Sequence, residues 1–313
     1  MTITAMRTIV GMPTVTSPRS TRRAELSLAA ERLRAPACKA NVARNARAEV
    51  GRHARWAPVR EQVWELVEPL LGRGARVAIV GAGYGDTVPI GRVAAGAGEV
   101  ALIDLDGPAI RTARRRQSRR LRRRIDVVEH DVTCGAADVI TAAAANAAVP
   151  DASAILERPL PGAPYDLVIG DLFYSQLLYP ALVDLEVPDA RMAAFLERFG
   201  PMLTRSVVSR LHVSAGEGRV LHIHDPIAWW PGHPQPVTLE LILATAEHDP
   251  AAALSLAARG RGPHHSDPRP AIRALSIPIT TTELWRWPFA PDVDYLACAT
   301  FAGPAHIRGS TPA

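Results

Sequence analysis

Long apolar runs are missing from this sequence. No stretch of the 313 residues approaches the ~18 consecutive apolar residues from which a membrane-spanning helix is built. The opening segment, MTITAMRTIVGMPTVTSPRS, also lacks the apolar core of about seven residues and the small-residue cleavage site of a signal peptide. We therefore expect a cytoplasmic protein with no membrane partner.

Cysteine is scarce as well. The three cysteines, Cys38, Cys134 and Cys298, lie far apart in the sequence and form no Cys-x-x-Cys pair. This spacing excludes a zinc site built on cysteines, and it favours free thiols in a reducing compartment. Internal repeats are also absent, so a repeat architecture is not expected.

Acidic residues are sparse in the first 60 residues, where three Glu face 12 Arg or Lys (+9). The remaining 253 residues carry 24 positive and 28 negative groups (−4), so the net charge of +5 belongs to this leader. An arginine-rich leader can contact nucleic acid, but a solvated extension is the simpler interpretation. We expect residues 1–20 to be disordered and residues 21–58 to form a basic helical extension.

Beyond the leader, short apolar runs alternate with helical patterns. PVREQVWELVEPLL (58–71) predicts an amphipathic helix. Strands are then predicted, with helices between them, at 76–80, 99–104, 125–130, 165–170 and 219–225. Such alternation implies right-handed crossovers and a parallel sheet covered on both faces, with ligands at the carboxyl ends of the strands. The pattern therefore predicts a doubly wound α/β domain.

The rest of the body contains one more predicted strand and two long interruptions. The run YLACATFAG (295–303) alternates like an antiparallel edge strand. Residues 184–215 are predicted to be helical, and residues 226–275 form a proline-rich connection longer than ordinary loops. We interpret both segments as insertions in a catalytic domain that spans 59–313, the second one covering the substrate.

Three glycines, Gly81, Gly83 and Gly85, follow the first predicted strand, and the acid Asp86 comes next. Glycine at a strand-to-helix turn lets the backbone approach a ligand closely. A dinucleotide-binding turn has the spacing GxGxxG, yet its third glycine is replaced here by Asp86. A carboxylate would repel a pyrophosphate and attract a ligand cation, so a dehydrogenase is disfavoured.

Acidic residues also end the next two strands. Asp104 ends the second strand, where a carboxylate can accept hydrogen bonds from both hydroxyls of a ribose. Asp106 is better interpreted as a helix N-cap, because Gly107 and Pro108 follow it. Asp131 lies at the end of the third strand, within reach of an adenine edge. Together with the glycine turn, these acids predict a nucleoside site.

These motifs resemble those of class I S-adenosylmethionine (SAM)-dependent methyltransferases. VAIVGAGYGD is similar to the glycine-rich first motif of that family, VALIDLD to the second-strand motif, EHDVT to the third and PYDLVIGDLFYSQLL to the fourth. The resemblance covers roughly residues 60–225 and the final strand. It implies a Rossmann-like methyltransferase fold with a mostly parallel seven-stranded sheet, and SAM as the cofactor.

The resemblance also implies a set of cofactor-binding residues. The glycine turn would line the methionine part, Asp104 the ribose and Asp131 the adenine, while residues 170–172 would flank the sulfonium. The full set is Gly81, Ala82, Gly83, Gly85, Asp86, Asp104, Leu105, Asp131, Val132, Gly170, Asp171 and Leu172. The fourth motif departs from the [DN]PP[YF] of adenine-amino methyltransferases, which disfavours methylation of a nucleobase.

A catalytic base is needed only where the acceptor must lose a proton. The candidates are His224, Asp225 and Tyr174, with His222, Tyr179 and Asp171 as further possibilities. Strand alternation puts His222 and His224 on one face, which with His233 invites a metal interpretation. Packing or polar lining explains these histidines better, so no metal is expected.

Three other clusters attract attention. The dipeptide Trp229–Trp230 and the run WRW (285–287) could wall an aromatic acceptor pocket or belong to the core. HHSD (264–267) stands among prolines and is predicted to be an exposed loop. The segment 111–124 holds nine arginines, but no aromatic side chains are interleaved with them, so nucleic acid is not an expected partner.

The sequence therefore predicts SAM-dependent methyl transfer, to oxygen or nitrogen, on a small-molecule acceptor. The oligomeric state is left open, with a homodimer as one possibility. Two alternatives remain. One is an aminopropyltransferase resembling spermidine synthase, which GDLFY favours and SQLL disfavours. The other is a non-catalytic cofactor-binding or scaffold protein that docks through its basic leader.

Overall fold

The fold is known from a computed structural model, which describes residues 36–46, 51–150 and 158–303. The segment expected to be disordered (1–20) and the first part of the expected basic extension (21–35) lie outside the described residues. Part of the basic extension is described and is helical: α2 (Pro36–Ala46) and the short α3 (Arg52–Arg55). The division into domains stays a prediction.

Seven strands form one sheet in the order β3-β2-β1-β4-β5-β7-β6. The first five strands are parallel to one another, and β7 runs antiparallel to both β5 and β6. The predicted mostly parallel, seven-stranded α/β sheet is confirmed. The strands are β1 (Arg76–Val80), β2 (Glu99–Asp104), β3 (Ile125–Glu129), β4 (Leu167–Asp171), β5 (Arg219–Trp229), β6 (Ile279–Ala290) and β7 (Val293–Ala302).

The last two strands differ from the prediction in one respect. The final strand is antiparallel, as expected, but it is not the edge of the sheet, because β6 pairs along its other side. β6 escapes the sequence pattern because Pro288 stands within it and its exposed Thr and Glu side chains conceal the apolar alternation. Trp285 and Trp287 are the buried side chains of this strand, so the core interpretation of WRW is confirmed.

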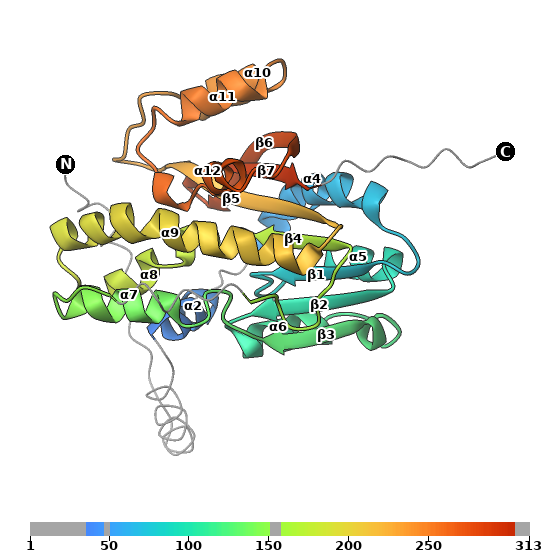
Figure 1. The fold of residues 1–313 in the computed structure, drawn as a ribbon. Coiled ribbons are helices and arrows are strands. Elements are labelled where there is room, and N and C mark those ends of the chain that lie inside the picture. The colour runs from blue at the N-terminus through green and yellow to red at the C-terminus, as the bar shows by residue number, and fades with distance from the viewer. Residues whose placement is uncertain (1–35, 47–50, 151–157, 304–313) are drawn as a thin grey trace, which may run out of the picture.

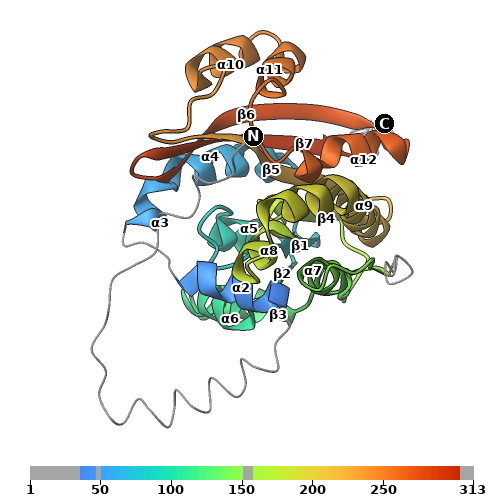
Figure 2. The same cartoon turned by 90° about the vertical axis from the view of Figure 1, so that its left-hand side faces the viewer.

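Helices cover both faces of the sheet (Figure 1, Figure 2). One apolar layer joins the sheet to α4 (Ala57–Val67), α5 (Ile90–Gly96) and α6 (Gly107–Arg115). The other joins the opposite face to α9 (Asp189–Ala215) and α12 (Pro268–Ala274). The parallel strands are therefore buried on both sides, which explains their continuous apolar runs.

Three smaller groups of helices lie around these layers. α7 (Ala136–Ala145), α8 (Tyr179–Asp184) and α9 share an apolar cluster, against which α2 packs. α10 (Leu239–Ala246) and α11 (Pro250–Ala257) form a hairpin over β5 and β6 at the top of Figure 1. Single helical turns occur at 68–70, 121–124, 174–176 and 264–266. No described helix is both long enough and apolar enough to cross a membrane.

Two helices show why local patterns succeed or fail. In α4, Val59, Val63 and Val67 are fully buried, as the predicted helical spacing requires. α6 begins at the expected N-cap, where Asp106 accepts a hydrogen bond from the Ala109 N–H at 3.0 Å. It ends at Arg115, however, so most of the arginine run lies in the following turn rather than on a long helix.

The two segments interpreted as insertions contain parts of the main architecture. α9 fills most of 184–215 and packs against both β4 and β5, which it connects. β5 continues to Trp229, four residues beyond its predicted end at residue 225. The prediction of an exposed loop at 264–267 is wrong, because Ser266 is 1% exposed and the Asp267 side chain is largely buried.

Candidate active site

The glycine turn after β1 adopts backbone angles that few side chains tolerate. The φ angles of Gly81, Gly83 and Gly85 are +77°, +45° and +70°. A Cβ atom on Gly81 would lie 2.8 Å from the main-chain oxygen of Asp171. Gly81 is therefore needed for close contact between this turn and the end of β4.

A cleft lies where β1, β2 and β4 end, bounded by the segment that follows β3. Seven of the predicted cofactor residues line it: Gly81, Gly83, Asp104, Leu105, Asp131, Val132 and Asp171. Five do not: Ala82, Gly85, Asp86, Gly170 and Leu172. The cleft therefore brings together the three strand-end acids and two of the three glycines.

Asp104 joins the glycine turn to the second strand. Its Oδ2 accepts a hydrogen bond from the Gly83 N–H at 2.9 Å, and its Oδ1 accepts one from the Asp106 N–H at 2.8 Å. The side chain is buried, at 6% exposure, and still lines the cleft. Asp104 thus positions two backbone segments and places a carboxylate at the cleft wall.

Asp131 organises the turn that leads into α7. Its Oδ1 accepts from the Thr133 N–H at 2.7 Å, and its Oδ2 accepts from the Gly135 N–H at 2.5 Å. The Thr133 hydroxyl donates to the same carboxylate. The Asp131 carboxylate is therefore held rigidly beside the cleft by its own turn.

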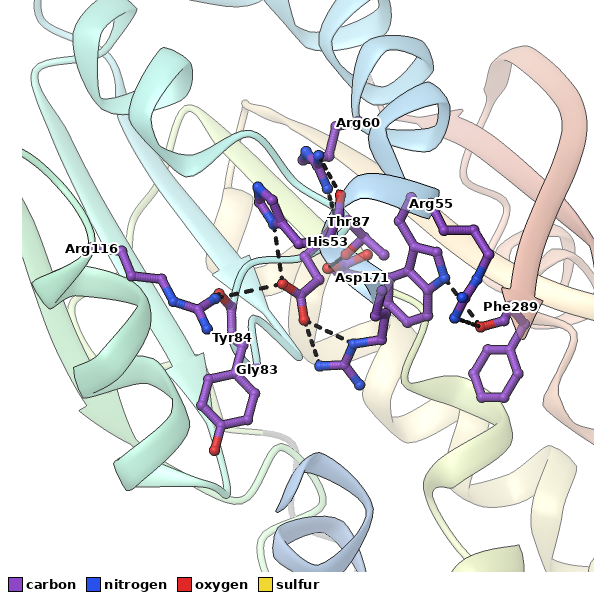
Figure 3. A network of polar contacts seen from close by, with 12 residues as sticks. His53, Arg55, Arg60, Gly83, Tyr84, Thr87, Arg116, Asp171 and Phe289 are labelled. Carbon is purple, nitrogen blue, oxygen red and sulfur yellow. Dashed lines mark hydrogen bonds and ion pairs between the residues drawn. The ribbon is translucent and has the colours of Figure 1, made fainter. Parts of the chain in front are cut away.

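Asp86 faces protein cations rather than the cleft. Its Oδ2 accepts hydrogen bonds from the Arg52 guanidinium at 2.5 and 3.0 Å, and its Oδ1 lies 3.4 Å from His53 and 3.6 Å from Arg116. The Asp86 side chain is only 9% exposed. Figure 3 shows this network, in which Arg60 also donates to the Asp86 carbonyl. The basic side chains around the Asp86 carboxylate come from α3 and the end of α6, and α4 contributes the contact to its main-chain carbonyl.

Asp171 is a buried carboxyl group at the end of β4. Its Oδ2 accepts from the Thr87 hydroxyl, and its Oδ1 has no hydrogen-bond partner among the described residues (Figure 3). Burial raises the pKa of Asp171 to about 7, against the lowering effect of the Thr87 hydrogen bond. The next residue, Leu172, has a φ of +51°, a conformation that costs free energy in a side-chain-bearing residue.

Tyr174 belongs to a buried chain of polar groups under α9. Its hydroxyl lies 2.5 Å from Nδ1 of His222, whose Nε2 lies 3.1 Å from Nε2 of His212. Burial raises the pKa of Tyr174 and lowers that of His222. Tyr174 does not line the cleft, whereas its stacked neighbour Phe173 does.

His224 and Asp225 are consecutive in β5 and contact different surroundings. His224 lies 3.4 Å from Asp267, in the segment before α12, and burial lowers its pKa to about 4. Asp225 accepts a hydrogen bond from the Ser175 hydroxyl at 3.0 Å through Oδ2. Its Oδ1 has no hydrogen-bond partner among the described residues, and burial raises its pKa to about 7. The three predicted catalytic residues therefore have three different partners: His222 for Tyr174, Asp267 for His224 and Ser175 for Asp225.

The metal interpretation gains no support from the described part of the chain. There, no three His, Cys, Asp or Glu side chains are grouped as metal ligands. His233 stacks on Trp230 with a ring separation of 3.9 Å. His222 and His224 share one face, as predicted, but their contacts are Tyr174 and Asp267.

Several residues of the site were missed by sequence reasoning. Thr87 and Ser175 each donate a hydroxyl to a buried carboxyl group, and Phe173 and Gln176 line the cleft. His130 also lines it, and burial, assisted by the Arg210 charge, lowers its pKa. Their only signal in the sequence is position: all but Thr87 follow the carboxyl end of β3 or β4, where parallel sheets bind ligands.

No protein-family model matches the chain, nor does any curated protein. Similar solved structures include magnesium protoporphyrin IX methyltransferase from Synechocystis PCC 6803 with bound S-adenosylhomocysteine (SAH), at 14% identity and a TM-score of 0.42, covering 80% of this chain and 83% of that one. A SAM-dependent methyltransferase from Aquifex aeolicus has 12% identity and a TM-score of 0.37, with 77% and 88% covered.

A third similar structure is fibrillarin from Aeropyrum pernix with natively bound SAM, at 12% identity and a TM-score of 0.39, covering 79% of this chain and 76% of that one. Two of these three proteins are named as methyltransferases, and two were crystallised with SAM or SAH. At such identities and TM-scores, function has to be inferred from the chain's own residues. Structural neighbours of this chain are SAM-dependent methyltransferases.

Proposed function

We propose that this chain binds SAM in the cleft and transfers its methyl group to the oxygen or nitrogen of a small-molecule acceptor. The observation that carries the proposal is the meeting of a positive-φ glycine turn with Asp104 and Asp131 around one cleft. Open backbone suits the amino-acid part of the cofactor, and strand-end carboxylates suit its nucleoside hydroxyl and amino groups.

The roles follow the path of the cleft. Asp104 and Leu105 at the end of β2 would hold the ribose, and Asp131 with Val132 would hold the adenine. The backbone of the glycine turn would hold the methionine part. Residues 170–172 would flank the sulfonium, where the unpartnered Oδ1 of Asp171 favours a positive charge. The residues of the cleft therefore fit the polarity of SAM.

Bound SAM would supply a methyl group attached to a cationic sulfur. The sulfur leaves as a neutral thioether, and its departure needs no metal. The chain would then contribute mainly position, because an in-line displacement is accelerated when its two reacting atoms are held in line. Asp225 is the candidate base where the acceptor must lose a proton, with its orientation set by Ser175. The row of hydrogen-bonded side chains Tyr174, His222 and His212, which lies under α9, would support the end of β4.

A small molecule is a better acceptor candidate than nucleic acid because several side chains of the arginine run already contact other parts of this protein. Arg111 pairs with Glu129, and Arg116 contacts Asp86 and the Tyr84 carbonyl. Arg124 donates to main-chain carbonyls at the C-terminal end of α5. These contacts anchor part of the run to the fold. Binding of labelled RNA in a gel-shift assay at 150 mM salt, with an affinity lost on Arg119→Ala and Arg123→Ala, would contradict this choice.

The proposal is tested by calorimetry of three ligands: SAH, SAM and decarboxylated SAM. We expect SAH and SAM to bind with comparable affinity, and decarboxylated SAM to bind more weakly. Tighter binding of the decarboxylated form would favour an aminopropyltransferase. Absence of binding by all three would reject the proposed cofactor.

A further inference from the structure

Two buried carboxyl groups end neighbouring strands of the sheet. Asp171 pairs in register with Ile223, and Asp225 follows Ile223 by two positions in β5. Asp225 stands where β5 shifts its register against β7, at the bulge between His224 and Ile227. Because side chains alternate along a strand, Asp171 and its partner Ile223 belong to one face of the sheet. This is the face opposite to His222 and His224.

Both carboxyl groups have the same pattern of hydrogen bonding and burial. One oxygen of each accepts a hydroxyl hydrogen bond, from Thr87 to Asp171 and from Ser175 to Asp225. The other oxygen, Oδ1 in both, is buried without a hydrogen-bond partner among the described residues. The side chains are 5% and 6% exposed. A buried acceptor without a donor is unfavourable, so each site is suited to a donor that a ligand brings.

Aromatic rings stand beside Asp225. Tyr295 in β7 pairs in register with Ala228, three positions after Asp225 in β5. Burial, together with the charge of Asp225, raises the pKa of Tyr295. Tyr295 continues into an aromatic cluster in which ring centroids lie 5.4 Å apart to Trp287 and 5.0 Å to Phe289. Phe289 is 39% exposed, so this cluster reaches the surface.

The far end of the cluster already binds a cation. Trp56 lies 4.9 Å from Trp287 and 5.9 Å from Phe289, and the Arg52 guanidinium stands 4.9 Å above its ring. A positive charge is thus stable against these rings, as expected for the electron-rich faces of aromatic side chains. Asp171 also lines the cofactor cleft, so a group held between the two carboxyls would lie next to the methyl donor.

We propose that the acceptor is an amine, primary or secondary, carried on a flat apolar body. This inference rests on the proposed function, because it names the substrate of the same site. A protonated amine brings at least two N–H donors and a positive charge, which match two unpaired carboxyl oxygens. A hydroxyl brings one donor, and an acidic acceptor would be repelled.

The reaction balances with the groups present. The ammonium first gives its proton to one of the two carboxylates, which leaves a lone pair on nitrogen. That lone pair forms the new nitrogen–carbon bond while the carbon–sulfur bond breaks, and its electrons stay on sulfur as a neutral thioether. Burial raises the pKa of Asp171 and of Asp225 to about 7, so either group can take up a proton near neutral pH.

The test compares three probes that share one aromatic body: 2-phenylethylamine, 2-phenylethanol and 3-phenylpropionate. Each is titrated by calorimetry into the full chain saturated with SAH. We expect the amine to bind at least tenfold more tightly than the alcohol, and the carboxylate not to bind. Asp225→Asn should reduce the affinity for the amine by tenfold or more while leaving SAH affinity within twofold.

Asp294→Asn is the matched control. Asp294 immediately precedes Tyr295, is 35% exposed in its side chain and lies 3.8 Å from Arg286, so its loss should leave all three affinities unchanged. The comparison of the three probes on the wild-type chain tests the amine acceptor even if Asp225→Asn fails to fold. SAH binding without a preference for the amine, or an unchanged preference in Asp225→Asn, would overturn the amine acceptor alone. Failure of SAH to bind would overturn the proposed function itself and this inference with it.

Discussion

At Gly81, just after β1, there is no room for a Cβ atom, so only glycine fits. A Cβ atom on Gly81 would contact the Asp171 carbonyl at 2.8 Å and the Phe173 ring at 2.9 Å, and the φ of +77° is unfavourable for any larger residue. The neighbouring strand cannot move away, because β1 and β4 are paired strands whose register extends to Val80 and Gly170. The position therefore requires glycine for geometric reasons, whatever the ligand is.

We expect Gly81→Ala to lower the free energy of unfolding by about 2 kcal/mol or more, from backbone strain and the collision with β4. Urea denaturation followed by circular dichroism measures this change. Gly72→Ala is the matched control, because a Cβ there meets nothing within 4 Å. Its effect should stay within about 0.5 kcal/mol. Equal losses in the two variants would contradict the geometric argument.

Asp104 combines a structural and a proposed binding role. Its carboxylate accepts backbone hydrogen bonds from Gly83 and Asp106 and also lines the cleft. We expect Asp104→Ala to weaken SAH binding by about tenfold to a hundredfold, because charge-assisted hydrogen bonds to the ribose are lost and the glycine turn loses an anchor. Calorimetry measures the affinity. Glu129→Gln, at the half-exposed end of β3, should bind SAH like the wild type, and unchanged affinity in Asp104→Ala would remove this residue from the site.

At the scale of elements, α3 is fastened to the glycine turn by charge. Arg52 and Asp86 are 17% and 9% exposed in their side chains, so their ion pair is shielded from water. Arg55 adds hydrogen bonds to the carbonyls of Pro288 and Phe289 in β6. α3 is thus tied both to the end of the glycine turn and to the edge strand β6.

Arg52→Ala should lower the free energy of unfolding by about 1 to 3 kcal/mol, because it leaves a buried carboxylate with weaker partners. Arg92→Ala is the control: its pair with Glu61 is about half exposed, and such pairs contribute about 0 to 1 kcal/mol. A cycle of denaturation curves for Arg52→Ala, Asp86→Asn and the double variant isolates the coupling. A coupling energy near zero would mean that this ion pair does not fasten α3.

At the scale of the whole molecule, two sets of buried titratable groups have opposite effects on how the free energy of unfolding changes with pH. Burial lowers the pKa of several histidines, so the folded chain binds fewer protons than the unfolded chain between about pH 4 and 6.5. These histidines are His130, His212, His222, His224, His233 and His265. Their contribution to stability is lost as the pH falls through that range. Asp171 and Asp225 act in the opposite sense, because their raised pKa of about 7 makes the folded chain hold protons that the unfolded chain has released.

Because the histidines outnumber the two acids, we expect the free energy of unfolding to rise between pH 4.5 and 6.5. Asp225→Asn removes a group whose stabilisation declines over the same range, so the rise should be steeper in that variant. Urea denaturation at three pH values measures both slopes. Asp294→Asn should have the wild-type slope. A slope in Asp225→Asn that is shallower than in the wild type would show that the Asp225 carboxyl is not buried as described.

The sequence alone determined the parallel part of the fold and the glycines and acids that meet at the cleft. Five runs of apolar residues ended by glycine or aspartate predicted the strands within a few residues, because a strand buried on both faces must be apolar throughout. The carboxyl ends of such strands meet at one edge, so Gly81, Asp104, Asp131 and Asp171 could be grouped without coordinates. The N-cap at Asp106 could also be predicted from the sequence, because helix capping depends on residues that are close in sequence.

Tertiary structure decided what depends on neighbours distant in sequence. β6 was concealed because its partner β7 and the helix α4, rather than its own alternation, bury Trp285 and Trp287. Asp86 looked like a ligand for a cation until Arg52, 34 residues earlier, supplied one. His224 and Asp225 were both candidate bases, but the packing places His224 beside Asp267 and Asp225 beside Ser175. Which groups a side chain meets is set by the packing of remote elements, and no local pattern records it.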